Sequence, residues 1–243
     1  MVEVTASYQI TEKAKEHATV HIAFPRIQER WSYLVVKRLF DFFFALIGLI
    51  VLAIPMAIIA LIIVFDSPGG AIFKQERLGK GGKPFVIYKF RTMNHDAEVN
   101  GPKWADKEDK RCTRFGAFLR KTRIDELPQL WNILVGDMSF VGPRPPLTYH
   151  PWKYEEYTDF QKRMFEVRPG ITGWAQVNGR KDVEWHKRIE LNVWYVDHMS
   201  LLLDIKIMFM TAFKVLTNAD NENSGATVNK STEPSNDAKV VKK

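Results

Sequence analysis

Residues 42–65 read FFFALIGLIVLAIPMAIIALIIVF, and no side chain in this run is charged. A straight α-helix of this length would be about 36 Å long, enough to cross the roughly 30 Å hydrocarbon core of a bilayer. The alternative is a core helix of a soluble protein, which is disfavoured because the run is apolar on every side. The run therefore predicts a helix embedded in a membrane.

Pro55 lies near the middle of this run. Proline has no N–H to donate, and its ring clashes with the carbonyl of Val51, so a bend is expected there. The two arms, residues 42–54 and 56–65, would be about 20 Å and 15 Å long, and each is too short to cross. Spanning helices that are kinked at proline are also common, so Pro55 alone leaves a spanning helix open.

Basic residues flank the run on both sides. They are Arg26, Arg30, Lys37 and Arg38 before it, and Lys74, Arg77, Lys80 and Lys83 after it. Positive charge tends to stay in the cytoplasm, so equal flanks favour a helix that enters and leaves by the same face. We therefore predict a re-entrant helix–break–helix hairpin over residues 37–66, with a single spanning helix as the alternative.

The remaining residues predict an α+β fold that is mainly helical. Two short strands on either side of Gly79–Gly82 predict a β-hairpin. The GKGGK turn is not a phosphate-binding loop, because Arg77 replaces its first glycine and Pro84 follows the lysine. Helices are expected over residues 114–135, with a break before Pro128, and over residues 152–166, 182–196 and 200–216. The last is apolar enough to pack in a core or to lie at a membrane interface.

The two ends of the chain are polar. Residues 1–36 predict an N-terminal polar arm, and residues 94–113 predict a loop. Residues 217–243 contain no aromatic side chain, which predicts a disordered tail.

The overall charge points to an anionic partner. The chain has 35 Lys and Arg against 28 Asp and Glu, a formal net charge of +7. Nucleic acid, an anionic membrane and phosphorylated substrates all fit such a balance. The single cysteine, Cys112, excludes a disulfide framework and any multi-cysteine metal site. The six histidines show no spacing typical of metal ligands.

Two adjacent carboxylates, Asp125 and Glu126, are the best candidates for chemistry. Adjacent side chains on a helix point about 100° apart, so one carboxylate can approach a reacting atom while the other holds a metal. Pro128 suits the first turn of a helix, whose free N–H groups attract phosphate. Arg120 adds positive charge nearby. Ordinary helix capping is the alternative for this segment.

Further candidates for binding phosphate lie outside this segment. Arg144 stands between prolines, which stiffen the backbone and pre-position the guanidinium for a two-point contact. Lys89 and Arg91 share one face of a predicted strand and could line a groove for an anion. The alternatives are a surface arginine in a turn and a half-buried strand with a solvated face.

A loop over residues 168–180 mixes glycines, a tryptophan and polar donors. Its Gln176, Asn178 and Arg180 could hold a nucleotide base and ribose, with a structured loop of no further role as the alternative.

Seven motifs follow one another along the chain. They are Lys37–Asp41 (KRLFD), Pro55 within the apolar run, Gln75–Gly79 (QERLG), Tyr88–Met93 (YKFRTM), Asp125–Gln129 (DELPQ), Gly136–Pro145 (GDMSFVGPRP) and Arg168–Arg180. In this order they resemble the bacterial sugar transferases, the monotopic phosphoglycosyl transferases. The resemblance covers residues 33–216, and seven motifs in order make chance implausible.

The resemblance implies a reaction. A sugar 1-phosphate passes from a UDP-sugar to undecaprenyl phosphate, UMP is released, and exopolysaccharide, capsule or related glycan assembly begins. Asp125 matches the family's nucleophile, which forms a covalent phosphosugar intermediate, and Glu126 matches the residue associated with Mg²⁺. Arg144 matches a phosphate-contacting arginine, and Lys89 and Arg120 match basic residues near the site.

The resemblance also implies a location at the cytoplasmic face of the bacterial cell membrane. It implies a re-entrant helix broken at Pro55 and a cytoplasmic catalytic domain with interfacial helices over residues 67–216. The cytoplasmic leaflet and downstream glycosyltransferases are expected partners, and nucleic acid is not. The family often has a small residue such as serine before the mid-run proline, where this chain has Ile54.

A membrane-anchored scaffold or nucleic-acid binder is the hypothesis from another class. Such a protein would contact phosphates without a carboxylate at the centre of its site. Asp125 and Glu126 disfavour it, because two negative charges would repel a polyanion.

Overall fold

The structure is a computed structural model that describes residues 31–94, 97, 111–179 and 184–217. Within these residues the fold is mainly helical with two small two-stranded sheets, as the α+β prediction required. The helices are α1 (Trp31–Asp66), α2 (Arg114–Lys121), α3 (Gln129–Val135), α4 (Asp159–Lys162), α5 (Trp174–Asn178), α6 (Trp185–His198) and α7 (Leu201–Thr217). The strands are β1 (Ile72–Leu78), β2 (Pro84–Phe90), β3 (Ser139–Val141) and β4 (Gly170–Thr172).

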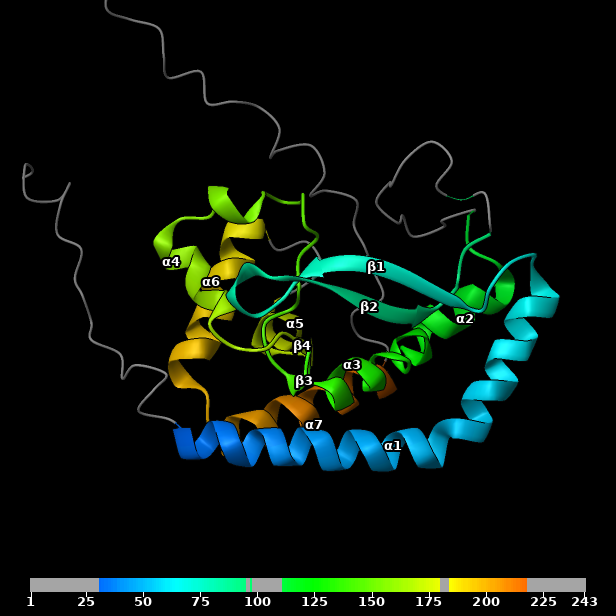
Figure 1. Cartoon of the computed structure of the whole chain (residues 1–243), viewed down its shortest axis with the longest axis horizontal. Coiled ribbons are helices and arrows are strands. Elements are labelled where there is room, and N and C mark those ends of the chain that lie inside the picture. The colour runs from blue at the N-terminus through cyan, green and yellow to red at the C-terminus, as the bar shows by residue number, and fades with distance from the viewer. Residues whose placement is uncertain (1–30, 95–96, 98–110, 180–183, 218–243) are drawn as a thin grey trace, which may run out of the picture.

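Helix α1 is continuous and contains Pro55. Figure 1 shows that it bends sharply part-way along, so that one arm runs beneath the rest of the protein and the other rises beside it. A proline inside a helix removes one backbone hydrogen bond and is a usual cause of such a bend. The helix begins at Trp31 rather than at residue 37. Among the described residues, it is the one helix long and apolar enough to cross a membrane.

Both arms of α1 pack against the same domain. In the first arm, Arg38 Nη1 donates to the carbonyl oxygen of Ile133, near the end of α3, over 2.6 Å. In the second arm, Ile63 is buried in a cluster with Leu119 of α2. The two ends of the apolar run are therefore held on one globular body.

A buried acidic residue joins three helices. Asp204 of α7 accepts hydrogen bonds from Tyr33 Oη over 2.8 Å and from Lys37 Nζ over 2.6 Å, both on α1. Its other carboxylate oxygen accepts from Tyr195 Oη of α6 over 2.6 Å. The start of α1 is thus fixed to α6 and α7 by one side chain.

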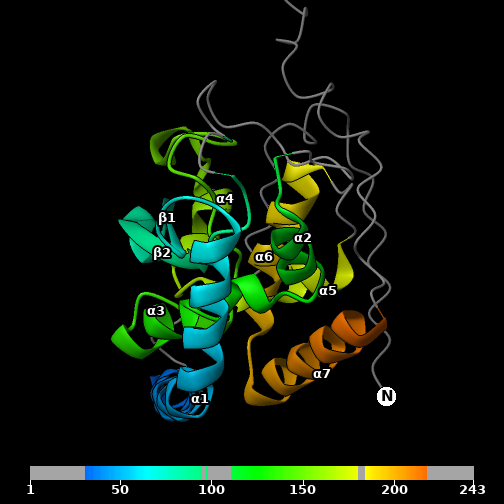
Figure 2. The same cartoon turned by 90° about the vertical axis from the view of Figure 1, so that its right-hand side faces the viewer.

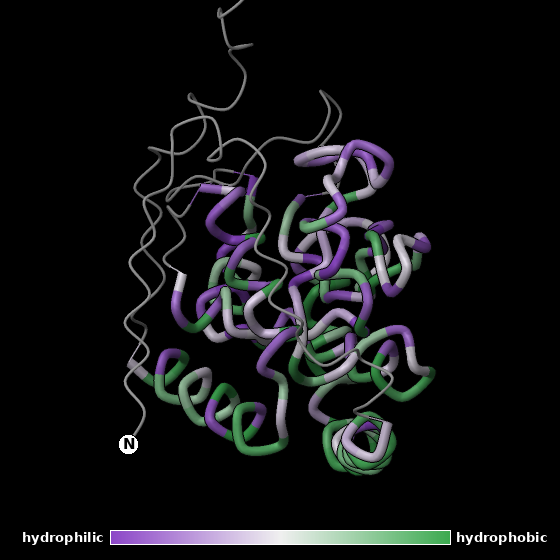
Figure 3. The backbone as a smooth tube through the Cα atoms, turned by 90° about the vertical axis from the view of Figure 1, so that its left-hand side faces the viewer, coloured by the Kyte–Doolittle hydropathy of each residue, from purple (hydrophilic) through white to green (hydrophobic). Residues whose placement is uncertain are grey.

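Helices α1 and α7 lie on the same side of the molecule (Figure 2), and hydrophobic residues recur along both (Figure 3). Both helices expose many large apolar side chains. Among the most exposed are Leu39, Ile50, Val51, Ile54 and Phe65 of α1, and Leu202, Phe209, Phe213 and Leu216 of α7. Soluble monomers rarely expose an apolar surface of this extent. The surface fits contact with lipid.

The predicted β-hairpin is confirmed. Strands β1 and β2 are antiparallel, with Ile72 opposite Phe90 and Leu78 opposite Pro84. Gly82 has a φ of +72°, and a Cβ there would lie 2.4 Å from the Tyr154 ring, so the turn requires glycine at this position. The parallel pair β3 and β4, by contrast, was not predicted, because each strand has only three residues and the two are far apart in sequence.

The prediction of one helix over residues 152–166 is wrong. The structure places only short turns there, among them α4, and Tyr157 has extended backbone angles. Tyr157 is buried, and its ring packs edge-on against those of Trp152 and Phe165, which favours a compact turn over a straight helix. Thr158 then caps α4 by accepting a hydrogen bond from the Gln161 backbone.

The other predicted helices are present with shifted bounds. The region 114–135 contains α2 and α3, separated by a 3₁₀ turn over Ile124–Glu126, and α6 and α7 occupy the last two predicted regions. The predicted polar arm up to residue 30, the C-terminal tail from residue 218 and most of the 94–113 loop lie outside the described residues.

Candidate active site

The two carboxylates lie on the 3₁₀ turn between α2 and α3. Arg123, immediately before this turn, adopts a left-handed backbone conformation with a φ of +60°. Such a conformation is unfavourable for a residue with a side chain and is often found at functional sites. Pro128 follows with helical angles and leads into α3. The sharp reversal at Arg123 places Asp125 and Glu126 side by side, each only 8% exposed.

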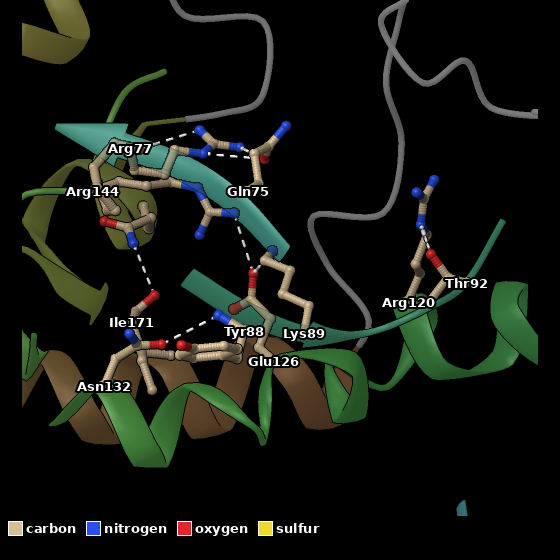
Figure 4. A network of polar contacts seen from close by, with 12 residues as sticks. Gln75, Arg77, Tyr88, Lys89, Thr92, Arg120, Glu126, Asn132, Arg144 and Ile171 are labelled. Carbon is tan, nitrogen blue, oxygen red and sulfur yellow. Dashed lines mark hydrogen bonds and ion pairs between the residues drawn. The ribbon is translucent and has the colours of Figure 1, made fainter. Parts of the chain in front are cut away.

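Glu126 is held by two cations. Its Oε1 accepts hydrogen bonds from Lys89 Nζ over 2.9 Å and from Arg144 Nη2 over 3.1 Å (Figure 4). Burial by itself would raise the pKa of Glu126, but the charges of Lys89 and Arg144 outweigh it and hold the pKa well below its usual range. Glu126 is therefore an anion at any physiological pH.

Asp125 has a different environment. No described residue donates a hydrogen bond to its carboxylate, and it forms no ion pair with them. Burial raises the pKa of Asp125, the nearby Glu126 charge raises it further, and Lys89, Arg120 and Arg123 oppose both effects. Two adjacent carboxylates whose pKa values are shifted in opposite directions are suited to different tasks.

Arg144 is positioned by strand β1. The backbone N–H of Leu78 donates to the carbonyl oxygen of Pro146 over 3.0 Å, which ties the proline-rich loop to this strand. Arg77 donates from Nη1 to the carbonyl oxygen of Pro145 over 3.1 Å. The loop therefore holds the Arg144 guanidinium over Glu126.

Arg77 is a site residue that the sequence reasoning missed. Its guanidinium also donates twice to Gln75 Oε1, over 2.6 Å and 3.1 Å (Figure 4). Burial lowers the pKa of Arg77 to about 10, and the neighbouring positive charge of Arg144 adds to this effect. The two guanidinium groups therefore add positive charge beside the dyad, which suits contact with phosphoryl oxygens. The QERLG motif was the available signal, but the sequence assigned it no role.

Asn132 is a second residue that was missed. It is fully buried on α3, and its Nδ2 donates to the carbonyl oxygen of Val86 over 2.7 Å. Its Oδ1 accepts from the backbone N–H of Tyr88 over 3.2 Å. This clamp fixes β2 against α3 and so places Lys89, the next residue, beside Glu126.

Two of the predicted basic residues make their described hydrogen bonds away from the dyad, although the charge of Arg120 still acts on Asp125. Arg91 donates to the carbonyl oxygens of Ile63, Ser67 and Pro68, at and just beyond the end of α1. Arg120 donates from Nε to Thr92 Oγ1 over 2.8 Å, away from Glu126 (Figure 4).

The residues predicted to bind substrate on the 168–180 loop do not all line the site. Gln176 lines a cavity together with Glu126 and Arg144, and its Nε2 donates to the carbonyl oxygen of Ile171 over 3.0 Å. Asn178 is exposed and donates to the Trp174 carbonyl oxygen over 3.1 Å. Arg180 lies outside the described residues.

The site fits one mode of magnesium binding. In the part of the chain that the structure describes, no three or more His, Cys, Asp or Glu side chains are grouped so that they could hold a metal ion. Mg²⁺ is commonly bound by one or two carboxylates together with substrate phosphates and water. Both hydrogen bonds to Glu126 are made by Oε1, which leaves Oε2 for a cation. The donor set is thus sufficient only when a phosphorylated substrate is present.

The chain is similar to known sugar transferases. The model of the family described as bacterial sugar transferase matches residues 32–218. The chain is 46% identical over 184 residues to the uncharacterized sugar transferase EpsL of Bacillus subtilis (strain 168), which covers 75% of this chain and 88% of that protein.

Two further relatives have more specific names. The chain is 44% identical over 195 residues to the UDP-glucose:undecaprenyl-phosphate glucose-1-phosphate transferase of Xanthomonas campestris pv. campestris, covering 77% of this chain and 40% of that one. It is 40% identical over 188 residues to the UDP-N-acetylgalactosamine-undecaprenyl-phosphate N-acetylgalactosaminephosphotransferase of Aeromonas hydrophila, covering 76% and 44%.

Proposed function

Because the chain belongs to the bacterial sugar transferase family, we propose that it transfers a sugar 1-phosphate from a UDP-sugar to undecaprenyl phosphate and releases UMP. The product would start exopolysaccharide, capsule or related glycan assembly, and downstream glycosyltransferases would extend it. One relative is named as an exopolysaccharide production protein. Relatives are named for glucose and for N-acetylgalactosamine, so the proposal extends to the reaction and not to one sugar.

The observation that carries the proposal is the contrast between the two carboxylates. Asp125 is buried beside cations but accepts no hydrogen bond from the described residues, whereas Glu126 is bound by Lys89 and Arg144. A carboxylate without hydrogen bonds keeps its lone pairs for attack, and its raised pKa makes the anion more basic. This contrast supports attack by Asp125 and organisation of charge by Glu126.

In the first half-reaction, an oxygen of Asp125 bonds to the β-phosphorus of the UDP-sugar. The bond from that phosphorus to the bridging oxygen breaks, and UMP leaves with the oxygen. Lys89, Arg144 and Arg77 face the negative charge that develops on the phosphoryl oxygens. Fixed cations of this kind stabilise the transition state because they need no reorganisation during the reaction.

In the second half-reaction, a phosphate oxygen of undecaprenyl phosphate bonds to the same phosphorus. The bond from Asp125 to phosphorus breaks, the carboxylate is regenerated, and the sugar leaves on the lipid diphosphate. Splitting the transfer in two lets a water-soluble donor and a lipid acceptor use one site in turn.

Glu126 would hold Mg²⁺ through the carboxylate oxygen that accepts no hydrogen bond. The ion, when bound, supplies charge neutralisation at the donor diphosphate.

We place the domain at the cytoplasmic face of the bacterial membrane, with α1 as a re-entrant hairpin in the cytoplasmic leaflet. The packing of both α1 arms on one domain supports this arrangement, because a spanning helix would carry its first residues to the opposite side. The basic residues on both sides of the apolar run support this arrangement further, because positive charge tends to stay in the cytoplasm. Nucleotide sugars are also supplied in the cytoplasm.

The Asp125→Asn variant tests the mechanism, because it removes the nucleophile and keeps the shape. Wild-type protein incubated with a UDP-sugar alone should release UMP and gain the mass of one sugar phosphate, measured on the intact protein. Asp125→Asn should do neither while still reaching the membrane fraction. Near-normal turnover by Asp125→Asn would exclude the covalent mechanism.

A further inference from the structure

A cavity of about 260 Å³ lies next to Glu126, between α3, β4, α5 and α7. Its walls are mostly apolar and include Leu130, Phe140, Ile171, Val177 and Val215. Glu126 and Arg144 are part of its lining, so it reaches the reaction centre that the proposed function uses. Asp125 does not line it.

The wall that α7 contributes connects this cavity with the apolar surface of the protein. Thr211, Lys214 and Val215 line the cavity and share one face of the helix, because residues three and four apart are neighbours. Phe213 and Leu216 point elsewhere and are 67% and 85% exposed. One helix therefore presents one face to the cavity and another to the exposed apolar surface.

The cavity wall is fixed in place. Thr211 Oγ1 donates to the carbonyl oxygen of Ile207 over 2.7 Å and lies 2.6 Å from Thr172 Oγ1 of β4. This pair joins α7 to the strand behind the site. The cavity is therefore part of the folded protein and not a gap beside a loose helix.

Basic side chains line the solvent-facing part of the cavity. Lys121 and Arg123 are exposed and Lys214 is half-buried, whereas the apolar lining residues Leu130 and Val177 are buried. An apolar interior with a cationic rim suits an amphiphile that carries phosphate at one end.

The donor fits this cavity poorly. Pockets for drug-sized ligands hold about 300–1,000 Å³, and a UDP-sugar, with its nucleoside, diphosphate and hexose, lies at the large, polar end of that range. The polar groups Gln75, Arg77 and Lys89 lie on the side of the dyad formed by the β1–β2 hairpin (Figure 4). The donor and the acceptor can therefore approach the dyad from different sides.

We propose that this cavity is the acceptor site, in which the first isoprene units of the polyprenyl phosphate lie between α3 and α7. The cationic rim, and Lys214 in particular, guides the lipid phosphate from the membrane surface to Arg144. This inference rests on the proposed function. It adds a site for one substrate and a specificity role for α7.

The kinetic test separates the two substrates. In a two-step transfer, kcat/KM for the donor reports the first half-reaction alone. Lys214→Glu and Val215→Trp should therefore lower kcat/KM for undecaprenyl phosphate about tenfold, equivalent to about 1.4 kcal/mol, and leave kcat/KM for the UDP-sugar within about twofold. The first variant reverses the rim charge, and the second fills the cavity from a position that is 38% exposed.

Matched controls lie on the same helix. Lys206→Glu makes the same charge change on α7 away from the cavity, and Leu216→Trp adds the same ring at an exposed position. Both should leave the two kcat/KM values unchanged. An equal loss of kcat/KM for the UDP-sugar and for undecaprenyl phosphate would overturn the acceptor site. A loss of kcat/KM in the control variants as large as in the test variants would overturn it too.

A second measurement does not depend on turnover. A short polyprenyl phosphate with a diazirine on its first isoprene unit should label residues of α7 and α3 that line the cavity, and excess undecaprenyl phosphate should prevent this labelling. Labelling confined to the exposed face of α1, or labelling that undecaprenyl phosphate does not reduce, would overturn the site. Absence of UMP release by the wild type with every UDP-sugar would instead reject the proposed function, and the labelling would still report on the cavity.

Discussion

At the scale of single residues, two neighbouring carboxylates of the candidate site have opposite surroundings. Glu126 is the partner of Lys89 and Arg144, and Asp125 is left without a hydrogen bond among the described residues. The left-handed backbone at Arg123 makes this possible, because it turns the chain just before the dyad. The local strain at Arg123 is offset by the contacts of the two helices on either side.

Arg144→Lys should be severely impaired although it keeps the positive charge. An ammonium is a point charge on a flexible stem and cannot reproduce the planar two-point contact of a guanidinium. The expected loss is roughly 2–4 kcal/mol of transition-state stabilisation, measured from kcat/KM for the UDP-sugar. A near-wild-type rate would reduce Arg144 to a structural arginine of the proline-rich loop.

Lys89→Met should move the acid limb of the pH profile of kcat/KM for the UDP-sugar to higher pH. In the proposed mechanism the Asp125 anion is the attacking form, so activity should be lost as pH falls through its pKa. Burial raises that pKa and the Lys89 charge lowers it, so removing the charge raises it further. Lys83→Met, at an exposed position of the same hairpin, should leave the acid limb in place. A shift of the acid limb of Lys89→Met to lower pH would contradict the proposed role of Asp125 as the attacking group.

At the scale of elements, α1 is a bent helix whose two arms are both attached to the catalytic domain. Pro55 lies inside this helix, and exposed apolar side chains occur on both sides of it. A re-entrant hairpin, the proposed arrangement, agrees with these observations, since the charge-free part of each arm, residues 42–54 and 56–65, is too short to cross a bilayer by itself.

Pro55→Ala should shift part of the population to a spanning topology. The change restores one backbone donor and removes a ring clash, together about 3 kcal/mol in a helix interior, while straightening also breaks the contacts of one arm. A cysteine at position 5, with Cys112 replaced, is labelled with a membrane-impermeant reagent in intact cells. The wild type should stay unlabelled until lysis, and Pro55→Ala should gain labelling from outside.

Ile54→Ala is the control for this experiment, because it changes the neighbouring side chain and no backbone donor. It should behave as the wild type does. Labelling of the wild-type N-terminus in intact cells would establish a single spanning helix.

At the scale of the whole molecule, a small number of buried polar contacts joins α1 and α7 to the rest of the described fold. Asp204 links α7 to α1 and α6, and Asp41 of α1 accepts from the Phe140 backbone N–H over 3.0 Å. These contacts give α1 and α7 a defined position under the site, which apolar packing alone would specify less strictly.

Asp204→Ala should destabilise the protein by about 3–5 kcal/mol, because it leaves the Lys37 ammonium without its partner in a mostly buried position. The measurement is the unfolding transition in detergent. Asp204→Asn should lose less unfolding free energy than Asp204→Ala, since its amide oxygen can still accept the hydrogen bond from Tyr195. Lys37→Met combined with Asp204→Ala should recover part of the loss, and no recovery would show that the pair does not interact energetically.

The sequence by itself determined the features that depend on neighbouring residues. The charge-free run over residues 42–65, the bend expected at Pro55, the hairpin around Gly79–Gly82 and the helix over α7 all follow from local pattern and backbone chemistry. The candidate dyad and Arg144 were also visible, because their motifs are contiguous.

Only the tertiary structure decided which side chains meet. Lys89 and Arg91 share one face of a strand in the sequence pattern, yet Lys89 reaches Glu126 and Arg91 reaches the end of α1. Arg77 enters the site because β1 packs against the proline-rich loop, a contact between residues far apart in the chain. Periodicity fixes the face on which a side chain lies, but the packing of distant elements fixes what that face contacts, and no local pattern records this packing.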